Sequence, residues 1–377
     1  MQSEQIKTAF FYILIVFIAT FFAFAAEKLF ASGRTKTKKV CGSILFSLSF
    51  FSLFFVAAFS NCGADYESYN NVFLIGNDFS SVYGFHGMEK GFTILIFLIR
   101  KITNDVNVYN VLLALVFLMP VYRAIYKLRK ITPLTWSIFI FSTLFFFQYL
   151  DLKRLFIASG IVLYGMTLWI LDKKKKTSIL LILIAISFHV SALLALVPIV
   201  IDFISKKKKN ALSVSITVLT FLVIVILFRN ELLSFSLSGR HSNYSLNTNV
   251  SFGPMQFIYF LPIIIIYAYK IKDTSDSEIA KFGYYNIIIG FSLGLFSYFY
   301  TMIGRAYPFF AFGFLIIPSI LAKHKNAISW NTKFNKISLI SASFIVCYCF
   351  LRTYVYFNEY LLLDQISPYT NIFGWSI

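Results

Sequence analysis

Acidic and aromatic side chains gather directly after an apolar run, in the stretch NCGADYESYN. Asp65 lies there close to Tyr66 and Tyr69. A carboxylate of this kind can act as a general base toward a hydroxyl group, and tyrosine rings can stack on sugar faces or donate hydrogen bonds. The structural alternative is that Asp65 caps the helix that follows and that the tyrosines form an interfacial belt.

Arginines near the ends of apolar runs form a second group of candidates. Arg154 opens an apolar run in QYLDLKRLFIASG, with Asp151 one turn earlier as a candidate ion-pair partner, and Arg305 lies in a short connection before Tyr307. The planar guanidinium group binds phosphate in a bidentate manner, so these positions predict a phosphate-bearing ligand. The alternative is that the arginines snorkel at helix ends or pair with acids.

Two isolated residues and one loop complete the candidates. His189 is the only histidine inside an apolar run, where it either takes part in chemistry or bonds a backbone carbonyl that pins a bend. Glu89 precedes the short apolar stretch 91–99, as a functional acid or as an acid favoured by a helix N-terminus. The stretch SGRHSNYSL adds three candidates for binding a polar ligand: Arg240, His241 and Tyr244.

The elements that must position these residues are apolar helices. Hydrophobic residues make up 58% of the 377 and charged residues 13%, whereas a soluble domain has about 25% charged residues. Runs close to the ~20 residues that span a bilayer predict an all-α polytopic membrane protein with about 11–12 transmembrane helices in a single membrane domain, 1–377. The expected spans are about 8–27, 41–60, 107–123, 133–150, 155–172, 178–203, 210–228, 255–270, 282–301, 306–322 and 337–356.

Basic residues are concentrated in six loops, which hold 24 of the 34 Lys and Arg residues. The positive-inside rule places these loops in the cytoplasm, so the net charge of +18 is a topology signal and does not indicate a nucleic-acid partner. Both termini and the long loops 61–106 and 229–254 then face outward. The segment 178–203 lies between the lysine runs 173–176 and 206–209, which are both expected inside. It should therefore turn back at SFHVS as two half-helices.

Sequence motifs for ATP binding, serine hydrolysis or zinc-dependent hydrolysis are absent. The four cysteines and the scattered acids match no metal-ligand spacing, and we expect no metal and no cofactor. The substrate is therefore either already activated or moved by a passive or ion-driven carrier.

An ordered set of stretches resembles the EpsG-type family of Wzy-like polysaccharide polymerases. These are GADYESYNNVF, MEKGFTILIFLI, RLFIASGIVLYGMTLWIL, ISFHVSALLALVPIV and GRAYPFFAFGFLIIPSIL, followed by ISPYTNIF in the tail. The resemblance covers most of the chain. One element departs from it, because Lys90 follows the acid where proline is frequent in the family.

The resemblance implies an enzyme with GT-C-like architecture in the bacterial inner membrane. Its substrates would be oligosaccharide repeat units on undecaprenyl pyrophosphate, joined into O-antigen or capsule at the periplasmic face. Membrane lipids and a polysaccharide co-polymerase that regulates chain length are the further partners it suggests. The catalytic residues it implies are Asp65, Arg154, Arg305, His189 and Glu89. The substrate-binding residues that follow from the sequence as a whole are Tyr66, Tyr69 and Tyr307 in the matching stretches, together with Arg240, His241 and Tyr244 in the outer loop.

Two other functions fit the same pattern. A flippase or transporter of lipid-linked sugars would also show many spans, intramembrane charge and a broken helix, although it usually has an internal repeat and none is found. A GT-C glycosyltransferase that adds a branch sugar to O-antigen would share the site but take a single sugar from a lipid monophosphate.

Overall fold

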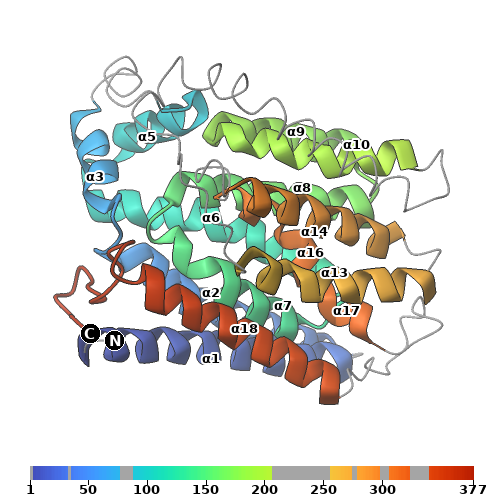
Figure 1. Cartoon of the computed structure of the whole chain (residues 1–377). Helices are drawn as coiled ribbons and strands as arrows, with labels where there is room; N and C mark the ends of the chain where they lie inside the picture. The colour runs from blue at the N-terminus through green and yellow to red at the C-terminus, as the bar shows by residue number, and fades with distance from the viewer. Residues whose placement is uncertain are drawn as a thin grey trace.

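The described part of the chain is almost wholly helical (Figure 1). The computed structural model describes residues 3–32, 35–76, 88–205, 255–273, 278–297, 305–322 and 339–377. Within these ranges the only strand-like pairing is two isolated β-bridges, so the predicted all-α class is confirmed. The expected span 210–228 lies outside the described residues.

Five described helices are long and apolar enough to cross a membrane, which makes the chain a multi-pass membrane protein. The first has no proline or glycine inside it, and it exposes Phe10, Phe17 and Phe21 as a lipid-facing helix would. The five helices are α1 (Ser3–Ser32), α2 (Lys36–Phe59), α6 (Val106–Leu128), α8 (Lys153–Leu171) and α18 (Leu339–Tyr360). Beside them lie α13 (Met255–Asp273) and α14 (Glu278–Phe296).

Two expected spans are broken into short pieces. The span 133–150 consists of α7 (Leu134–Phe141), a π-helical turn (Ser142–Phe146) and a 3₁₀ turn (Phe147–Tyr149). Ser142 donates a hydrogen bond to the carbonyl of Ile138, which is the kind of side-chain bond that competes with the helical ladder. The span 306–322 likewise divides into three: a 3₁₀ turn (Tyr307–Phe310), α16 (Ala311–Leu315) and α17 (Ile317–Leu321).

The predicted hairpin within 178–203 is confirmed. Its pieces are α9 (Lys175–Phe188), a 3₁₀ turn (Val190–Ala195) and α10 (Leu196–Ser205), with the break at His189. Lys175 Nζ, at the start of α9, lies 6.0 Å from the ring centroid of Phe203 near the end of α10. The chain therefore enters and leaves at one end. The 14 residues of α9 rise about 21 Å, which is less than the hydrocarbon core of about 30 Å.

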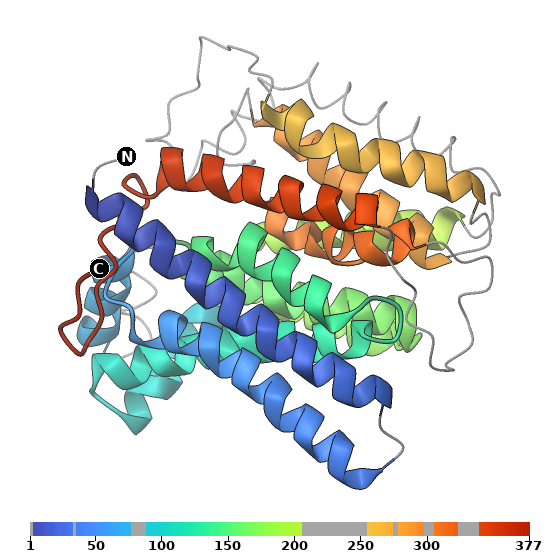
Figure 2. The same ribbon diagram turned by 90° about the horizontal axis from the view of Figure 1, so that it is seen from below.

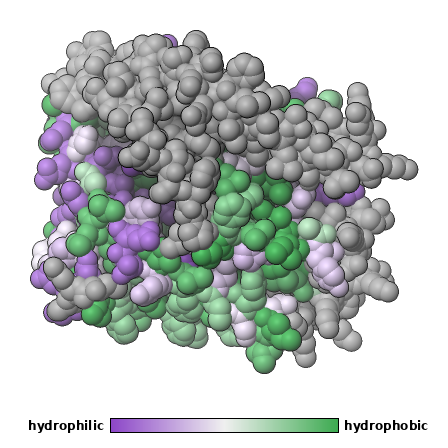
Figure 3. All heavy atoms as spheres, viewed as in Figure 1, coloured by the Kyte–Doolittle hydropathy of each residue, from purple (hydrophilic) through white to green (hydrophobic). Residues whose placement is uncertain are grey.

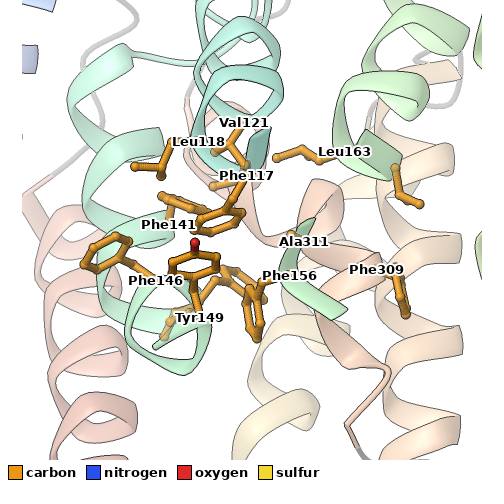
Figure 4. Packing of buried hydrophobic residues seen from close by; sticks show 14 of the residues in the cluster. Phe117, Leu118, Val121, Phe141, Phe146, Tyr149, Phe156, Leu163, Phe309 and Ala311 are labelled. Carbon is orange, nitrogen blue, oxygen red and sulfur yellow. The ribbon is translucent and has the colours of Figure 1, made fainter. Parts of the chain in front are cut away.

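Helix α8 forms the centre of the bundle, and nearly all of its residues are buried. Figure 4 shows aromatic side chains packed where α8 meets α6 and the turn that follows α7. The rings of Phe117 and Tyr149 are stacked with centroids 4.3 Å apart, and Phe156 meets Phe117 edge-on at 5.9 Å. This packing sets the position of the first turn of α8, which carries Arg154.

The two ends of the bundle carry different charged groups. At one end, Lys127 bonds Asp172, Lys173 bonds Glu278, and Arg129 stacks on Phe30, which joins loops expected to lie inside. At the other end lie both termini and two short helices, α3 (Tyr66–Ile75) and α5 (Lys90–Ile102) (Figures 1 and 2). Hydrophilic spheres gather at that end in Figure 3, and an apolar band crosses the middle of the molecule.

Candidate functional site

Arg154 and Glu89 form an ion pair at the end that carries α3. Arg154 Nη1 lies 2.8 Å from Glu89 Oε2, with side-chain exposures of 27% and 19%. Arg154 Nε also donates to the hydroxyl of Tyr69 at 3.4 Å, so three helices meet at this guanidinium. The expected partner was Asp151, and that prediction is wrong: its carboxylate accepts a hydrogen bond from the backbone of Asp65 instead.

The second carboxylate oxygen of Glu89 reaches the bend of the hairpin. Glu89 Oε1 accepts a hydrogen bond from the backbone N–H of Val190 at 3.3 Å. Glu89 occupies the N-cap position of α5, yet its side chain makes no capping bond there. Gly91 allows this approach, because a Cβ at that position would overlap with Ser187 of α9. Glu89 therefore connects α5, α8 and the hairpin.

His189 lies at the break between α9 and the 3₁₀ turn. Its Nδ1 accepts a hydrogen bond from the backbone N–H of Ser191 at 3.3 Å, and its ring lies 6.3 Å from that of Phe309. The sequence interpretation had a bond to a backbone carbonyl, whereas this contact is to a backbone N–H, that of Ser191, directly after the break.

Three carboxyl groups gather beside this ion pair. Asp151 is 7% exposed and accepts a hydrogen bond from the backbone N–H of Asp65 at 3.2 Å. Burial, and then the charges of Asp364 and Asp65, raise the pKa of Asp151 to about 7. Burial also raises the pKa of Asp364, although a hydrogen bond from Tyr356 at 2.7 Å opposes that rise. Arg305 is exposed and lowers the pKa of both carboxyls, which places it facing this cluster.

Asp65 lies between the Arg154–Glu89 ion pair and the other two carboxyl groups of the cluster. It interacts electrostatically with Arg154 on one side and with Asp151 and Asp364 on the other. It occupies the N-cap position of α3, but its side chain makes no capping hydrogen bond. The structural alternative raised from the sequence, in which Asp65 serves as a helix cap, therefore finds no support in its contacts.

A backbone strap holds Asp65 in place. The N–H of Gly63 donates to the carbonyl of Gln365 at 2.9 Å, and the N–H of Ala64 donates to that of Asp364 at 2.9 Å. Gly63 has φ = +115°, and a Cβ there would overlap with the carbonyl oxygen of Leu150. Glycine is thus required for the close approach of the three segments.

Lys153 is a buried cation that the sequence interpretation did not single out. It is 1% exposed, its Nζ donates to Asn110 Oδ1 at 2.6 Å, and it lies 4.9 Å from the ring centroid of Tyr66. Asn110 in turn donates to Asn70 at 3.2 Å, so this polar network joins α3 to α6 and α8. In the sequence, the one indication of a role for Lys153 was its position directly before Arg154. Nothing in the sequence indicated a role for Asp364, because only the backbone pairing of the tail with residues near Asp65 brings it to this end.

The remaining candidates are distributed as follows. Tyr66 donates to Asn61 Oδ1 at 2.9 Å, and Tyr69 is buried against Phe92. Tyr307 donates to the carbonyl of Leu144 at 3.1 Å and contacts Gln148. Arg352 also lies close to Tyr307, with its guanidinium carbon 5.7 Å from the Tyr307 ring centroid and 3.6 Å from that of Tyr259. The residues Arg240, His241 and Tyr244 lie outside the described part of the chain.

This arrangement combines proton acceptors with cations in one place. The carboxylates can take a proton from a hydroxyl group, and the arginines can bind an anionic group. Within the described ranges, no three His, Cys, Asp or Glu side chains are placed so that they could hold a metal ion.

The fold and the site together define a multi-pass α-helical membrane protein with a charged site at one end of an apolar bundle. Residues 43–371 match the EpsG family, and the chain belongs to that family. The match runs from α2 into the C-terminal tail, so it includes every candidate residue. No curated protein and no solved structure matches the chain, so the GT-C-like architecture stays a prediction. Membership of the EpsG family indicates a polysaccharide polymerase-type role.

Proposed function

We propose that this protein is a glycosyltransferase that joins oligosaccharide repeat units carried on undecaprenyl pyrophosphate into O-antigen or a related surface polysaccharide. Family membership supports the general role. The observation that carries the proposal is the gathering of Asp65, Asp151 and Asp364 beside Arg154 and Arg305 at one end of the bundle.

The reaction needs one proton acceptor and one site for an anionic leaving group. A hydroxyl oxygen of the acceptor attacks the anomeric carbon of the donor, and the bond from that carbon to the pyrophosphate oxygen breaks. The hydroxyl proton moves to a carboxylate, and the electron pair leaves with the lipid pyrophosphate. The donor already carries its activation, in keeping with the absence of an ATP-binding motif from the sequence.

Asp65 is the proposed general base, because it is less buried than Asp151 and interacts with both parts of the site. Arg305 is the proposed first contact for the pyrophosphate, since it is exposed at the rim of the carboxylate cluster. A cation there offsets the charge that develops on the leaving oxygen. Arg154 lies further inside, where its ion pair with Glu89 fixes its direction.

The site is proposed to face the periplasm from the inner membrane. The support is the segregation of charge, because Lys127, Arg129 and Lys173 all lie at the opposite end of the bundle. Polymerisation at the periplasmic face would also give a polysaccharide co-polymerase access to the product. Such a regulator remains a proposed partner.

The test is Arg305→Lys, measured as ladder formation on a lipopolysaccharide gel in a strain that lacks the native gene and normalised to membrane protein level. Lysine keeps the charge but not the bidentate fork, so the expected result is a loss of about a hundredfold at normal protein level. Arg100→Lys is the matched control, because Arg100 lies over the ring of Phe73 and bonds the carbonyl of Leu74. A full ladder from Arg305→Lys would remove this residue from the site.

A flippase is the second candidate, because the broken hairpin at His189 is also typical of transporters. The same gel separates the possibilities in a deletion strain. Loss of a polymerase leaves lipid A-core with one repeat unit, whereas loss of a flippase leaves none. Loss of a branching enzyme keeps the ladder and changes only the serotype.

A further inference from the structure

A groove lies between α2 and α6 near the end of the bundle opposite the candidate site. It has a volume of about 620 Å³. Its wall is a set of packed rings: Phe46 lies 5.2 Å from Tyr122 and 5.7 Å from Tyr126, and Phe50 meets Tyr122 at 5.1 Å. Tyr122 is anchored by a hydrogen bond to the carbonyl of Ser49 at 2.8 Å. The groove is thus a fixed feature of the packing.

Four cations line the same groove: Arg123, Lys127, Arg129 and Lys130. The acid close to them is Asp172, and it is paired with Lys127 at 2.5 Å. Arg129 lies over the rings of Tyr126 and Phe30, at 3.8 and 4.6 Å from their centroids. Among the described residues, no acid forms a salt bridge with Arg123 or Arg129. Arg123 and Arg129 therefore bring positive charge to the groove that no described acid neutralises through a salt bridge.

The polar and apolar parts of the groove are separated along α6. Leu115 and Met119 line its deeper part, and the cations begin at Arg123, one turn closer to the end of the bundle. From Leu115 to Arg123 the helix rises about 12 Å, which sets the length of the apolar part of the groove. Met119 is 44% exposed, so the apolar part opens toward the surrounding lipid.

We propose that this groove is a binding site for one anionic phospholipid, with its phosphate among Arg123, Arg129 and Lys130 and an acyl chain along Leu115 and Met119. The charge of the cations selects an anionic headgroup over a zwitterionic one, because each basic residue near a lipid surface strengthens the attraction. The proposal depends on the protein being a membrane protein and does not depend on its catalytic activity.

The experiment measures lipid binding to the purified full-length protein in detergent by native mass spectrometry. The probes are phosphatidylglycerol and phosphatidylcholine with identical acyl chains. The test variant is Arg123→Gln with Lys130→Gln. The control is Lys36→Gln with Lys39→Gln, which removes the same charge from a smaller groove along α2, of about 450 Å³. A third variant, Leu115→Trp, keeps every charge and fills the deeper part of the site.

The expected result is one retained phosphatidylglycerol in the unaltered protein and an affinity about twenty-five-fold weaker in the test variant, from about a fivefold loss for each of its two cations. The control should stay within about twofold of the unaltered protein, and Leu115→Trp should lose the retained lipid. Equal weakening in the test variant and the control would overturn the proposal, because the attraction would then be spread over the surface. Equal retention of phosphatidylcholine, or retention of phosphatidylglycerol by Leu115→Trp, would overturn it as well.

Discussion

The ion pair between Glu89 and Arg154 should stabilise the junction of α5, α8 and the hairpin, and Glu89→Gln tests this directly. Glutamine keeps the shape of the side chain and can accept one hydrogen bond, but it removes the charge. Exposed ion pairs contribute about 0–1 kcal/mol, and breaking a fully buried pair costs about 3–5 kcal/mol. Since these side chains are 27% and 19% exposed, we expect Glu89→Gln to lower the free energy of unfolding by about 2 kcal/mol.

A double-mutant cycle isolates the pair itself. The proteins are Glu89→Gln, Arg154→Gln and the double variant, unfolded by a denaturing detergent in mixed micelles. Glu89 also accepts a hydrogen bond from the N–H of Val190. The part of the stability loss in Glu89→Gln that comes from this bond does not involve Arg154, so it cancels from the coupling energy. We expect a coupling energy of about 1 kcal/mol between the two side chains.

The control is Glu67→Gln, an exposed acid on neighbouring α3, which should change stability by less than about 0.5 kcal/mol. A coupling energy below about 0.3 kcal/mol would refute the reasoning, since the two charges would then not be stabilising one another. An equal loss in Glu67→Gln would refute it too, because the effect would then reflect net charge at this end of the bundle.

Three further predictions concern the site and the topology. Because the pKa of Asp151 is raised to about 7 in the folded protein, Asp151 binds more protons there than in the unfolded protein between about pH 4 and pH 7. The free energy of unfolding should therefore fall as pH rises through this window. Denaturation measured from pH 4 to 8 should show this fall in the native protein and not in Asp151→Asn. Gly63→Ala should reduce both ladder formation and thermal stability, because the new Cβ overlaps with the carbonyl of Leu150, and normal values for both would mean that the strap tolerates a side chain. Single cysteines at Ser80 and Asn247, in a background without the native cysteines, should react with an impermeant reagent in intact spheroplasts, whereas protection of both would reverse the proposed orientation.

Features set by local composition could be predicted from the sequence. The opposite placement of Lys173 and Asp65 follows from the distribution of charge between loops, and this segregation holds in the structure. The hairpin break at His189 follows from two lysine runs that are separated by too few residues for two full spans. The charge segregation and the hairpin break both follow from how each stretch of chain partitions between lipid and water, which depends on that stretch's own composition.

Features set by packing between distant segments could not be predicted in this way. Asp151 was the nearest acid to Arg154 in the sequence, yet Glu89 pairs with it because α5 lies against α9 where Gly91 permits close contact. Asp364 enters the site only through backbone pairing with Ala64. Hydropathy alone also left the breaks within 133–150 and 306–322 unseen, because π and 3₁₀ turns leave composition unchanged.

The strap between the start of α3 and the C-terminal tail has a consequence for biosynthesis. Asn61, Gly63 and Ala64 find their backbone partners in residues 364–370, which are translated after every described transmembrane helix. Membrane insertion can therefore finish while the loop that carries Asp65 is still unpaired. The order of synthesis makes the strap around Asp65 one of the last contacts of the molecule to form, because its partners in the tail follow every described transmembrane helix.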